Sequence, residues 1–292
     1  MSKSLSILLP TFNCFCRDLV TELQYQCEQA EIDYEIIVAD DGSTDKKIIE
    51  KNKSIINLKG VTYILRKQNV GRSAIRNFLI SISSKSYLLF IDGDLSINNP
   101  HFIENYIKAE GDVIVGGLTI TNDVKQWGSN LRFRYEQAFE KNNTLAIRQN
   151  KPYQNIRTTN LLIARSVIGA SLFDENFSHY GYEDVLLGKT FERKRFKVTH
   201  IDNPILLNDF ETNEQFLYKT EQALQTLNEF QQILKGYSKI IEYNDKFKVL
   251  HLHIVLRIVY KLIGKSFKKY LLNNKPRVFL FNLYKLLYFA YL

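Results

Sequence analysis

The sequence is poor in the residues and runs that mark several protein classes. It has 3 cysteines, at Cys14, Cys16 and Cys27, and no second cysteine or histidine cluster lies near them. A zinc site is therefore not expected, and reduced thiols fit better than a disulfide framework. The first residues lead into an apolar segment without the hydrophobic region of a signal peptide, so we expect a cytoplasmic protein.

Two glycine-rich nucleotide motifs are also missing. No Gly-x-x-x-x-Gly-Lys-Ser/Thr occurs, which excludes a P-loop nucleotidase, and no Gly-x-Gly-x-x-Gly follows the first apolar segment, which counts against a dinucleotide-dependent oxidoreductase. The net charge of +8 predicts anionic partners: nucleotide phosphates, a lipid surface or nucleic acid. Hydrophobic residues make up 45% of the 292 residues, which is ample for a packed core.

Short apolar segments alternate with helical patterns over most of the chain. The segments with the pattern of a buried strand are 5–10, 34–39, 61–65, 86–91, 112–117, 158–164 and 196–201. Strands that alternate with helices predict an α/β fold with a mixed, mostly parallel sheet flanked by helices. Ligands bind at the carboxyl ends of the strands in such sheets, so polar motifs at these ends are candidate site residues.

The motif Asp92-Gly93-Asp94 directly follows the fourth of these segments. Two carboxylates at a strand end suit a hard divalent cation that also holds diphosphate oxygens. Alone, an Asp-x-Asp motif is weak, because most chance matches are solvated turns. Its position after an apolar strand favours the functional interpretation.

A second acidic motif, which contains Asp41, follows the second segment. The same residues would also form an ordinary β-turn and helix cap. Arg72 and Arg76 lie one helical turn apart near the start of the next helix, where they could pair with Asp41 or contact a nucleotide. Without the neighbouring motifs, an exposed helix would explain both arginines.

Together these motifs resemble those of the inverting family 2 glycosyltransferases, which have the GT-A fold and bind nucleotide sugars. The matching segments, which span roughly residues 4 to 212, are Leu9–Asn13, Val38–Asp45, Asn69–Asn77, Phe90–Asp94 and Gly181–Asp184. The segment from Phe173 to Gly188 also resembles the C-terminal motif shared by galactosyl- and N-acetylgalactosaminyltransferases and bacterial chondroitin-type polymerases.

The resemblance implies a role for each matching residue. The implied nucleotide-binding residues are Pro10, Thr11, Phe12, Asp41, Arg72 and Asp92. Within this set, Asp41 would bind the uracil and Asp92 would contact the ribose. Asp94 would bind the Mn²⁺ or Mg²⁺ that is held by the diphosphate. Asp184 would be the catalytic base that takes the acceptor hydroxyl proton, and Glu183 beside it would orient the sugar or the acceptor.

One departure from the family pattern concerns the metal site. In many relatives a histidine follows an Asn-Pro dipeptide by a few residues, whereas this chain has Leu207 and Asn208 there. Asn208 or Asp209 offers oxygen ligands in its place. Trp127 and His179 are further candidates for the sugar or acceptor pocket, with core packing as the alternative for Trp127.

The last part of the chain predicts a helical appendage, which begins with one long helix over 213–234. After Asp245 no acidic residue occurs, and neither of the two following apolar runs reaches the roughly 18–20 residues that a spanning helix needs. The basic residues that share one helical face are Arg257, Lys261, Lys265 and Lys268. Such a basic amphipathic helix suits the interface of an anionic membrane. Packing on the catalytic domain or on a second copy is the alternative.

These features predict a GT-A glycosyltransferase domain over residues 1–212 and a membrane-associating helical region over 213–292. The expected enzyme is a hexosyl- or N-acetylhexosaminyltransferase that moves a sugar from a UDP-sugar to a hydroxyl of a glycan or lipid-linked saccharide. It would act peripherally on the inner face of the cell membrane, without nucleic acid as a partner. No Gln-x-x-Arg-Trp signature or multi-span channel occurs, so non-processive transfer is expected. The alternatives are a nucleotidyltransferase and a catalytically degenerate nucleotide- or glycan-binding protein.

Overall fold

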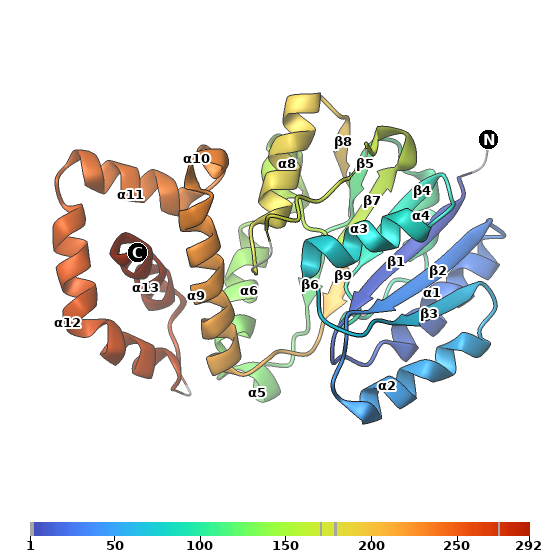
Figure 1. The fold of residues 1–292 in the computed structure, drawn as a ribbon, viewed down its shortest axis with the longest axis horizontal. Helices are drawn as coiled ribbons and strands as arrows, with labels where there is room; N and C mark the ends of the chain where they lie inside the picture. Colours follow the sequence, from blue (N-terminus) through green and yellow to red (C-terminus); the bar gives the residue numbers. More distant parts are fainter. Residues whose placement is uncertain (1–2, 170, 178–179, 274) are drawn as a thin grey trace.

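The structure is a computed structural model that describes residues 3–169, 171–177, 180–273 and 275–292. Its main feature is a seven-stranded sheet with the strand order β3-β2-β1-β4-β7-β5-β8 (Figure 1). The strands are β1 (Leu5–Thr11), β2 (Tyr34–Asp40), β3 (Val61–Leu65), β4 (Tyr87–Ile91), β5 (Val113–Val115), β7 (Asn160–Ala164) and β8 (Val198–His200). β7 runs antiparallel to both of its neighbours, whereas the other strands share one direction. The mixed, mostly parallel sheet expected from the sequence is confirmed.

Helices cover both faces of this sheet. Successive side chains of β1 point to opposite faces, so Ile7 joins one apolar core and Leu8 the other. The first core is covered by α1 (Arg17–Gln29) and α4 (Phe102–Lys108), and the second by α3 (Arg72–Ile82) and α8 (Glu183–Lys194). The helix α2 (Lys46–Lys53) follows β2 and begins after Asp45, whose side chain accepts hydrogen bonds from the first-turn N–H groups.

A small parallel pair of strands, β6 (Leu118–Ile120) and β9 (Ile205–Leu207), lies beside the main sheet. The strand expected over 112–117 ends at Val115, because the chain turns at the two glycines that follow. Gly117 has a φ of +96°, which favours glycine, and it turns the chain into β6. The sequence did not predict β9. Three short helices, α5 (Val124–Trp127), α6 (Leu131–Lys141) and α7 (Leu145–Asn150), lie between β6 and β7 along the chain.

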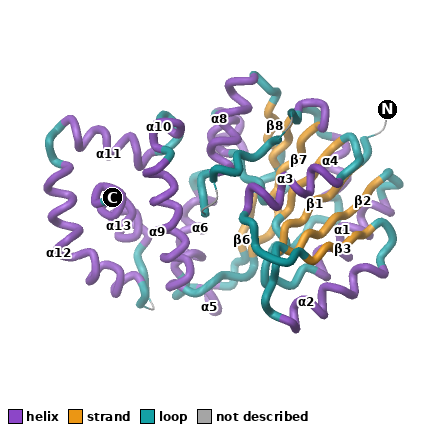
Figure 2. Tube along the Cα trace, viewed as in Figure 1, coloured by secondary structure: helices purple, strands orange, loops and turns teal. Residues whose placement is uncertain are grey.

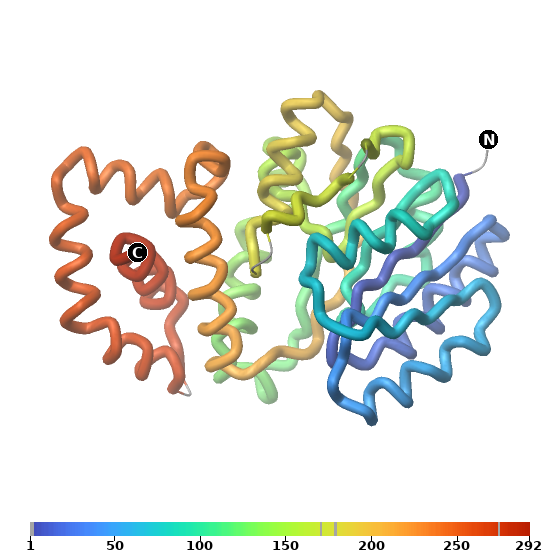
Figure 3. The backbone as a smooth tube through the Cα atoms, in the orientation of Figure 1, coloured from blue at the N-terminus to red at the C-terminus, as the bar shows by residue number. Residues whose placement is uncertain are grey.

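The rest of the chain is helical (Figure 2). Its helices are α9 (Asn213–Glu229), α10 (Gln231–Leu234), α11 (Lys239–Val249), α12 (His253–Leu271) and α13 (Val278–Tyr291). The long helix expected over 213–234 is broken at Phe230, which has non-helical dihedral angles and stacks on Phe177 at 4.1 Å between ring centroids. The chain runs outward from the sheet and returns, so α13 lies within the other helices (Figure 3).

These helices share an apolar core with the sheet domain. Phe281 and Tyr284 of α13 pack with Leu217 and Leu224 of α9 and with Leu131 of α6. The alternative of packing on the N-terminal part of the chain therefore holds for α9 and α13. Within the described residues, every helix is too short or too polar to cross a membrane.

Candidate active site

A pocket of about 260 Å³ lies at the carboxyl ends of β1, β2 and β4, and we refer to it as the Asp92 pocket. The residues that the sequence assigned to the nucleotide and the metal all line it, namely Pro10, Thr11, Phe12, Asp41, Arg72, Asp92 and Asp94. They come from four separate segments, which the parallel strands bring to one edge of the sheet. The pocket also has Tyr180 and Lys219 in its wall, and the sequence motifs assigned no role to either.

Two arginines on one face of α3 hold two carboxylates together. Arg72 donates from Nε to Glu183 Oε1 at 2.7 Å and from Nη2 to Asp92 Oδ2 at 3.1 Å. Arg76 donates from Nη2 to Asp92 Oδ1 at 2.7 Å and from Nη1 to Glu183 Oε1 at 3.4 Å. The i, i+4 spacing places both guanidinium groups on the same side of the helix. The end of strand β4 and the start of helix α8 are thereby joined by a four-charge cluster.

The pairing decides the charge state of these two acids. Burial would raise the pKa of Asp92, but the Arg76 and Arg72 guanidinium groups hold it below its usual range. Burial likewise opposes ionisation of Glu183, whose pKa the same two arginines lower overall. Both acids are therefore ionised at neutral pH and engaged with cations. Glu183 has only 8% exposure, so its main contacts are with the arginines.

Asp41 has a different role from the one that the arginine spacing suggested. Its carboxylate accepts hydrogen bonds from the backbone N–H groups of Val70 and Gly71, at 3.1 to 3.2 Å. Arg66 is the basic residue within ion-pair range, at 4.0 Å, and Arg76 turns to Asp92 and Glu183 instead. Asp41 thus anchors the loop before α3 while it still forms part of the pocket wall.

The segment Gly181 to Asp184 forms a strained turn that begins α8. Gly181 has a φ of +96° and Tyr182 a φ of +67°, which is unusual for a tyrosine. Glu183 is the first helical residue, and Asp184 Oδ1 accepts a hydrogen bond from the N–H of Val185 at 2.8 Å. Both acids occupy the first turn, where the helix dipole favours negative charge.

Asp184 differs from the two paired acids because it forms no ion pair with any residue that the structure describes. Burial and the adjacent charge of Glu183 raise its pKa to about 6, against the opposing effects of Arg72 and Arg157. It is therefore mostly ionised at neutral pH yet able to accept a proton. A carboxylate with this proton affinity is suited to general-base catalysis.

Helix α9 supports this turn from the C-terminal side of the chain. A Cβ atom on Gly181 would lie 2.7 Å from the Cβ of Ala223, so only glycine fits against the helix. Thr226 donates a hydrogen bond from Oγ1 to the carbonyl oxygen of Tyr180 at 3.2 Å. Lys219 Nζ lies 5.8 Å from the centre of the Tyr180 ring, and Lys219 lines the Asp92 pocket. The active-site wall thus extends past residue 212 into α9.

Asp94 lines the same pocket and carries no paired cation of its own among the described residues. Burial and the neighbouring charge of Asp92 raise its pKa. Within the part of the chain that the structure describes, no group of three or more His, Cys, Asp or Glu side chains is arranged to hold a metal ion. Mg²⁺ and similar ions are commonly held by one or two carboxylates together with substrate phosphates, so this donor set fits a cation that shares its ligands with a diphosphate.

The remaining candidates lie in different surroundings. Asn208 donates a hydrogen bond to Ser96 Oγ at 3.2 Å, and both Asn208 and Asp209 are exposed. Trp127 packs edge-on against Phe210, with 5.2 Å between ring centroids, in the first apolar core. This position matches the packing alternative for Trp127. His179 lies outside the described residues.

The sequence is similar to those of known proteins. A family profile described as "Glycosyl transferase family 2" matches residues 6–168. The chondroitin synthase of Escherichia coli is 27% identical over 229 residues, which are 65% of this chain. The chain spans 32% of that relative's length.

Two solved structures are similar in fold. The S. aureus TarS fragment in complex with UDP-GlcNAc has a TM-score of 0.51 at 17% identity, and the likeness covers 84% of this chain and 73% of that one. The mannosyltransferase PcManGT of Pyrobaculum calidifontis, in complex with GDP-Man and Mn²⁺, has a TM-score of 0.54 at 11% identity, covering 91% and 74%. These likenesses confirm the GT-A-like fold.

Proposed function

Because this chain belongs to glycosyl transferase family 2, we propose that it transfers a sugar from a UDP-sugar to a hydroxyl of a glycan or lipid-linked saccharide. The observation that carries the proposal is the convergence of Asp92, Asp94 and Arg72 in one pocket, with Glu183 joined to it through Arg72. The TarS structure holds UDP-GlcNAc, which supports a UDP-sugar donor. A single addition per binding event is proposed, as is inversion at the anomeric carbon.

The proposed chemistry uses Asp94 and Asp184, the two acids whose pKa values are raised. The acceptor oxygen forms a bond to the anomeric carbon while the bond from that carbon to the diphosphate oxygen breaks. Asp184 takes the proton that the acceptor hydroxyl loses. Glu183 acts as a positioning residue, since its ion pairs with Arg72 and Arg76 fix the first turn of α8.

A divalent cation, Mn²⁺ or Mg²⁺, would be held by Asp94 together with the diphosphate, and it would neutralise the charge of the leaving group. The PcManGT structure contains Mn²⁺, which supports this assignment. Asp94→Asn is expected to weaken Mn²⁺-dependent UDP binding by at least about tenfold, measured by calorimetry, because it removes the charged ligand. Asp18→Asn, on the exposed start of α1, serves as the matched control.

The direct test is a UDP-release screen with common UDP-sugars, with and without Mn²⁺, on wild type and Asp184→Asn. GDP-mannose serves as the comparison donor. Metal-dependent release from one UDP-sugar in the wild type, lost in Asp184→Asn, is the expected result. The absence of turnover with every donor and acceptor would contradict the transferase proposal and favour a binding protein. Release of pyrophosphate from UTP and a sugar phosphate would instead identify a nucleotidyltransferase.

We also propose that the enzyme binds the cytoplasmic surface of an anionic membrane through α12, the outer helix in Figure 1. The apolar residues that carry this face are Ile254, Val255, Ile258 and Leu262, with exposures between 51% and 76%. Arg257, Lys261 and Lys265 are exposed beside them, and no acidic residue follows Asp245. This combination supports burial of the apolar stripe at the headgroup level with the cations on anionic lipids.

Lys268, the fourth basic residue of the expected face, binds Glu221 of α9 at 2.9 Å and so contributes to packing instead. The wild-type protein is expected to float with vesicles that contain phosphatidylglycerol. It is not expected to float with vesicles of phosphatidylcholine alone. Ile258→Glu should abolish flotation, whereas Ile56→Glu, at 56% exposure and outside the C-terminal helices, should not. Equal flotation of both variants would contradict the role of α12.

A further inference from the structure

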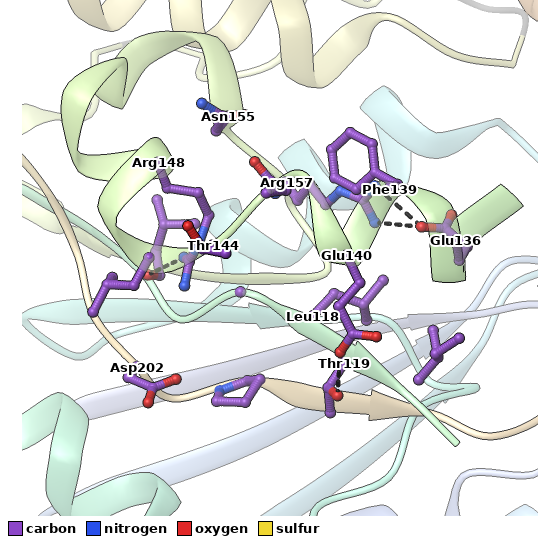
Figure 4. A pocket seen from close by; sticks show the side chains of 16 residues that line it. Leu118, Thr119, Glu136, Phe139, Glu140, Thr144, Arg148, Asn155, Arg157 and Asp202 are labelled. Carbon is purple, nitrogen blue, oxygen red and sulfur yellow. Dashed lines mark hydrogen bonds and ion pairs between the residues drawn. The ribbon is translucent and has the colours of Figure 1, made fainter. Parts of the chain in front are cut away.

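A second pocket, of about 310 Å³, lies beside β5 and β6 and under α6 and α7 (Figure 4). We refer to it as the Arg148 pocket. Among the described residues it shares no lining side chain with the Asp92 pocket. Its volume is near the lower limit of ligand pockets, which are commonly about 300–1,000 Å³, and it is similar to that of the Asp92 pocket.

The charges in this pocket disfavour an anion. Its acidic residues are Glu136, Glu140 and Asp202, and its basic residues are Arg148 and Arg157. The carboxylates exceed the guanidinium groups by one, so a phosphate, a sulfate or a carboxylated sugar would meet net negative charge. The nucleotide diphosphate therefore has its place in the Asp92 pocket, not here.

The polar groups leave hydrogen-bonding capacity for a ligand. Arg157 donates to Glu136 Oε2 at 3.2 Å from both terminal nitrogens, and Glu140 Oε1 accepts the Thr119 hydroxyl at 2.6 Å. Asp202 is exposed and forms no ion pair with any residue that the structure describes. The second oxygen of Glu140 and the carboxylate of Asp202, on different sides of the cavity in Figure 4, can accept hydrogen bonds from the hydroxyl groups of a ligand.

Arg148 forms part of the same cavity and is held in place by its own hydrogen bonds to the protein. Its side chain is 6% exposed, and it donates to the backbone carbonyls of Val115 and Ile201 at 3.4 and 3.2 Å. A Cβ on Gly117 would lie 2.9 Å from Arg148 Nη2, so the glycine permits this close approach. Apolar side chains, including Leu118 and Phe139, complete the wall. Apolar surface beside a few polar groups suits a sugar ring, which has apolar C–H faces and hydroxyl groups along its edge.

The Arg148 pocket adjoins the helix that carries Asp184. Asn155 in the pocket wall belongs to a short helical turn, Pro152–Asn155, which packs so closely on α8 that a side chain at Gly188 would collide with the carbonyl oxygen of Tyr153. Asp184 lies in the first turn of α8 and is not a lining residue of either pocket in the part of the chain that the structure describes.

We propose that the Arg148 pocket binds an uncharged sugar residue of the acceptor while the UDP-sugar occupies the Asp92 pocket. This inference rests on the proposed transferase function and adds the class of acceptor. Glu140 and Asp202 select the sugar by accepting hydrogen bonds from its hydroxyl groups. Phosphorylated sugars and uronates are rejected by the excess carboxylate.

The test uses saturation-transfer NMR and titration of the full chain with methyl glycosides of glucose, galactose, N-acetylglucosamine, N-acetylgalactosamine and glucuronic acid. At least one neutral glycoside should bind the wild type without displacement by UDP and Mn²⁺. Asp202→Asn and Glu140→Gln should weaken that binding by about tenfold or more, because each loses a charged hydrogen-bond acceptor. Asp18→Asn should bind like the wild type.

Several results would overturn the inference: no neutral glycoside binds, glucuronate binds more tightly than the neutral sugars, UDP displaces the glycoside, or the two pocket variants bind like the wild type. Thermal melts on each variant verify that it is folded. UDP binding with Mn²⁺ is measured on the same samples. A failure of the wild type to bind UDP would refute the donor site while the glycoside result still decides the Arg148 pocket.

Discussion

The proton affinity of Asp184 gives the sharpest prediction about the reaction. If Asp184 is the base, kcat/KM for the donor at saturating acceptor should rise with pH through an apparent pKa of about 6 and then level off. The sign follows from the mechanism, because the base must be ionised to take the proton. At pH 5 only about one-eleventh of the enzyme would be active, whereas an aspartate at its usual 3.8 would remain more than about 90% ionised.

The surrounding charges allow this pKa to be moved in both directions. Glu183→Gln removes the adjacent negative charge and should shift the acid limb of the profile to lower pH. Arg157→Met removes a favourable cation and should shift it to higher pH. Glu192→Gln, at an exposed position of the same helix, is the matched control and should leave the profile unchanged.

The assay is initial-rate UDP release between pH 4.5 and 8, with thermal melts of each variant across the range. A profile that is flat from pH 5 to 7, or a shift of Glu183→Gln toward higher pH, would refute the assignment of Asp184. Opposite shifts of the two variants are difficult to obtain from a purely structural effect. Their direction therefore tests the electrostatic argument apart from any loss of rate.

Three further substitutions test the scaffold of the site. Gly181→Ala should lower the free energy of unfolding in urea by about 1–3 kcal/mol and remove most of the turnover, because its Cβ would meet Ala223. The control Gly236→Ala is also at positive φ but has open space around it, so it should lose less stability and keep its activity. Arg76→Met should lower the free energy of unfolding by about 3–5 kcal/mol, because it leaves the largely buried carboxylates of Asp92 and Glu183 with one guanidinium group. An unchanged unfolding midpoint would contradict this pairing. Asp184→Asn should raise the free energy of unfolding by about 1–3 kcal/mol above pH 6. The reason is that the raised pKa of Asp184 in the folded state makes its ionised form destabilising, increasingly so as the pH rises from 3.8 to about 6. Below pH 4 the acid is protonated in the folded state, so this gain should vanish.

The sequence predicted those parts of the site that depend on local pattern. Apolar segments located the strands, and the position of Asp41, Asp92 and Asp94 at strand ends predicted that they would meet, as they do in the Asp92 pocket. The family motifs added Gly181 to Asp184, of which Glu183 is joined to that pocket through Arg72, whereas Asp184 is not one of its described lining residues. A parallel sheet brings its carboxyl ends to one edge whatever the intervening helices contain, so these predictions did not need tertiary detail.

Other contacts had no local signal. The spacing of Arg72 and Arg76 predicted a shared helix face but not its partners, and Asp92 and Glu183 are 16 or more residues away from Arg76 along the chain. Lys219 belongs to a helix that the sequence assigned to an appendage. The packing of α9 on the turn at Gly181 depends on how the C-terminal helices fold back on α6 and α8. Such long-range packing produces no recognisable pattern of apolar residues in the segment that it supports.

The electrostatics of the site divide its acids into two kinds. Asp92 and Glu183 are paired with arginines and have lowered pKa values, so their charges are already used to join the end of β4 to α8. Asp94 and Asp184 are less compensated and have raised pKa values, which is the property that the proposed roles require, a metal ligand for Asp94 and a proton acceptor for Asp184. The proposed inverting transfer would use one of them at the leaving diphosphate and the other at the attacking hydroxyl. The ion pairs of Asp92 and Glu183 with Arg72 and Arg76 hold the end of β4 and the start of α8 in position for these roles.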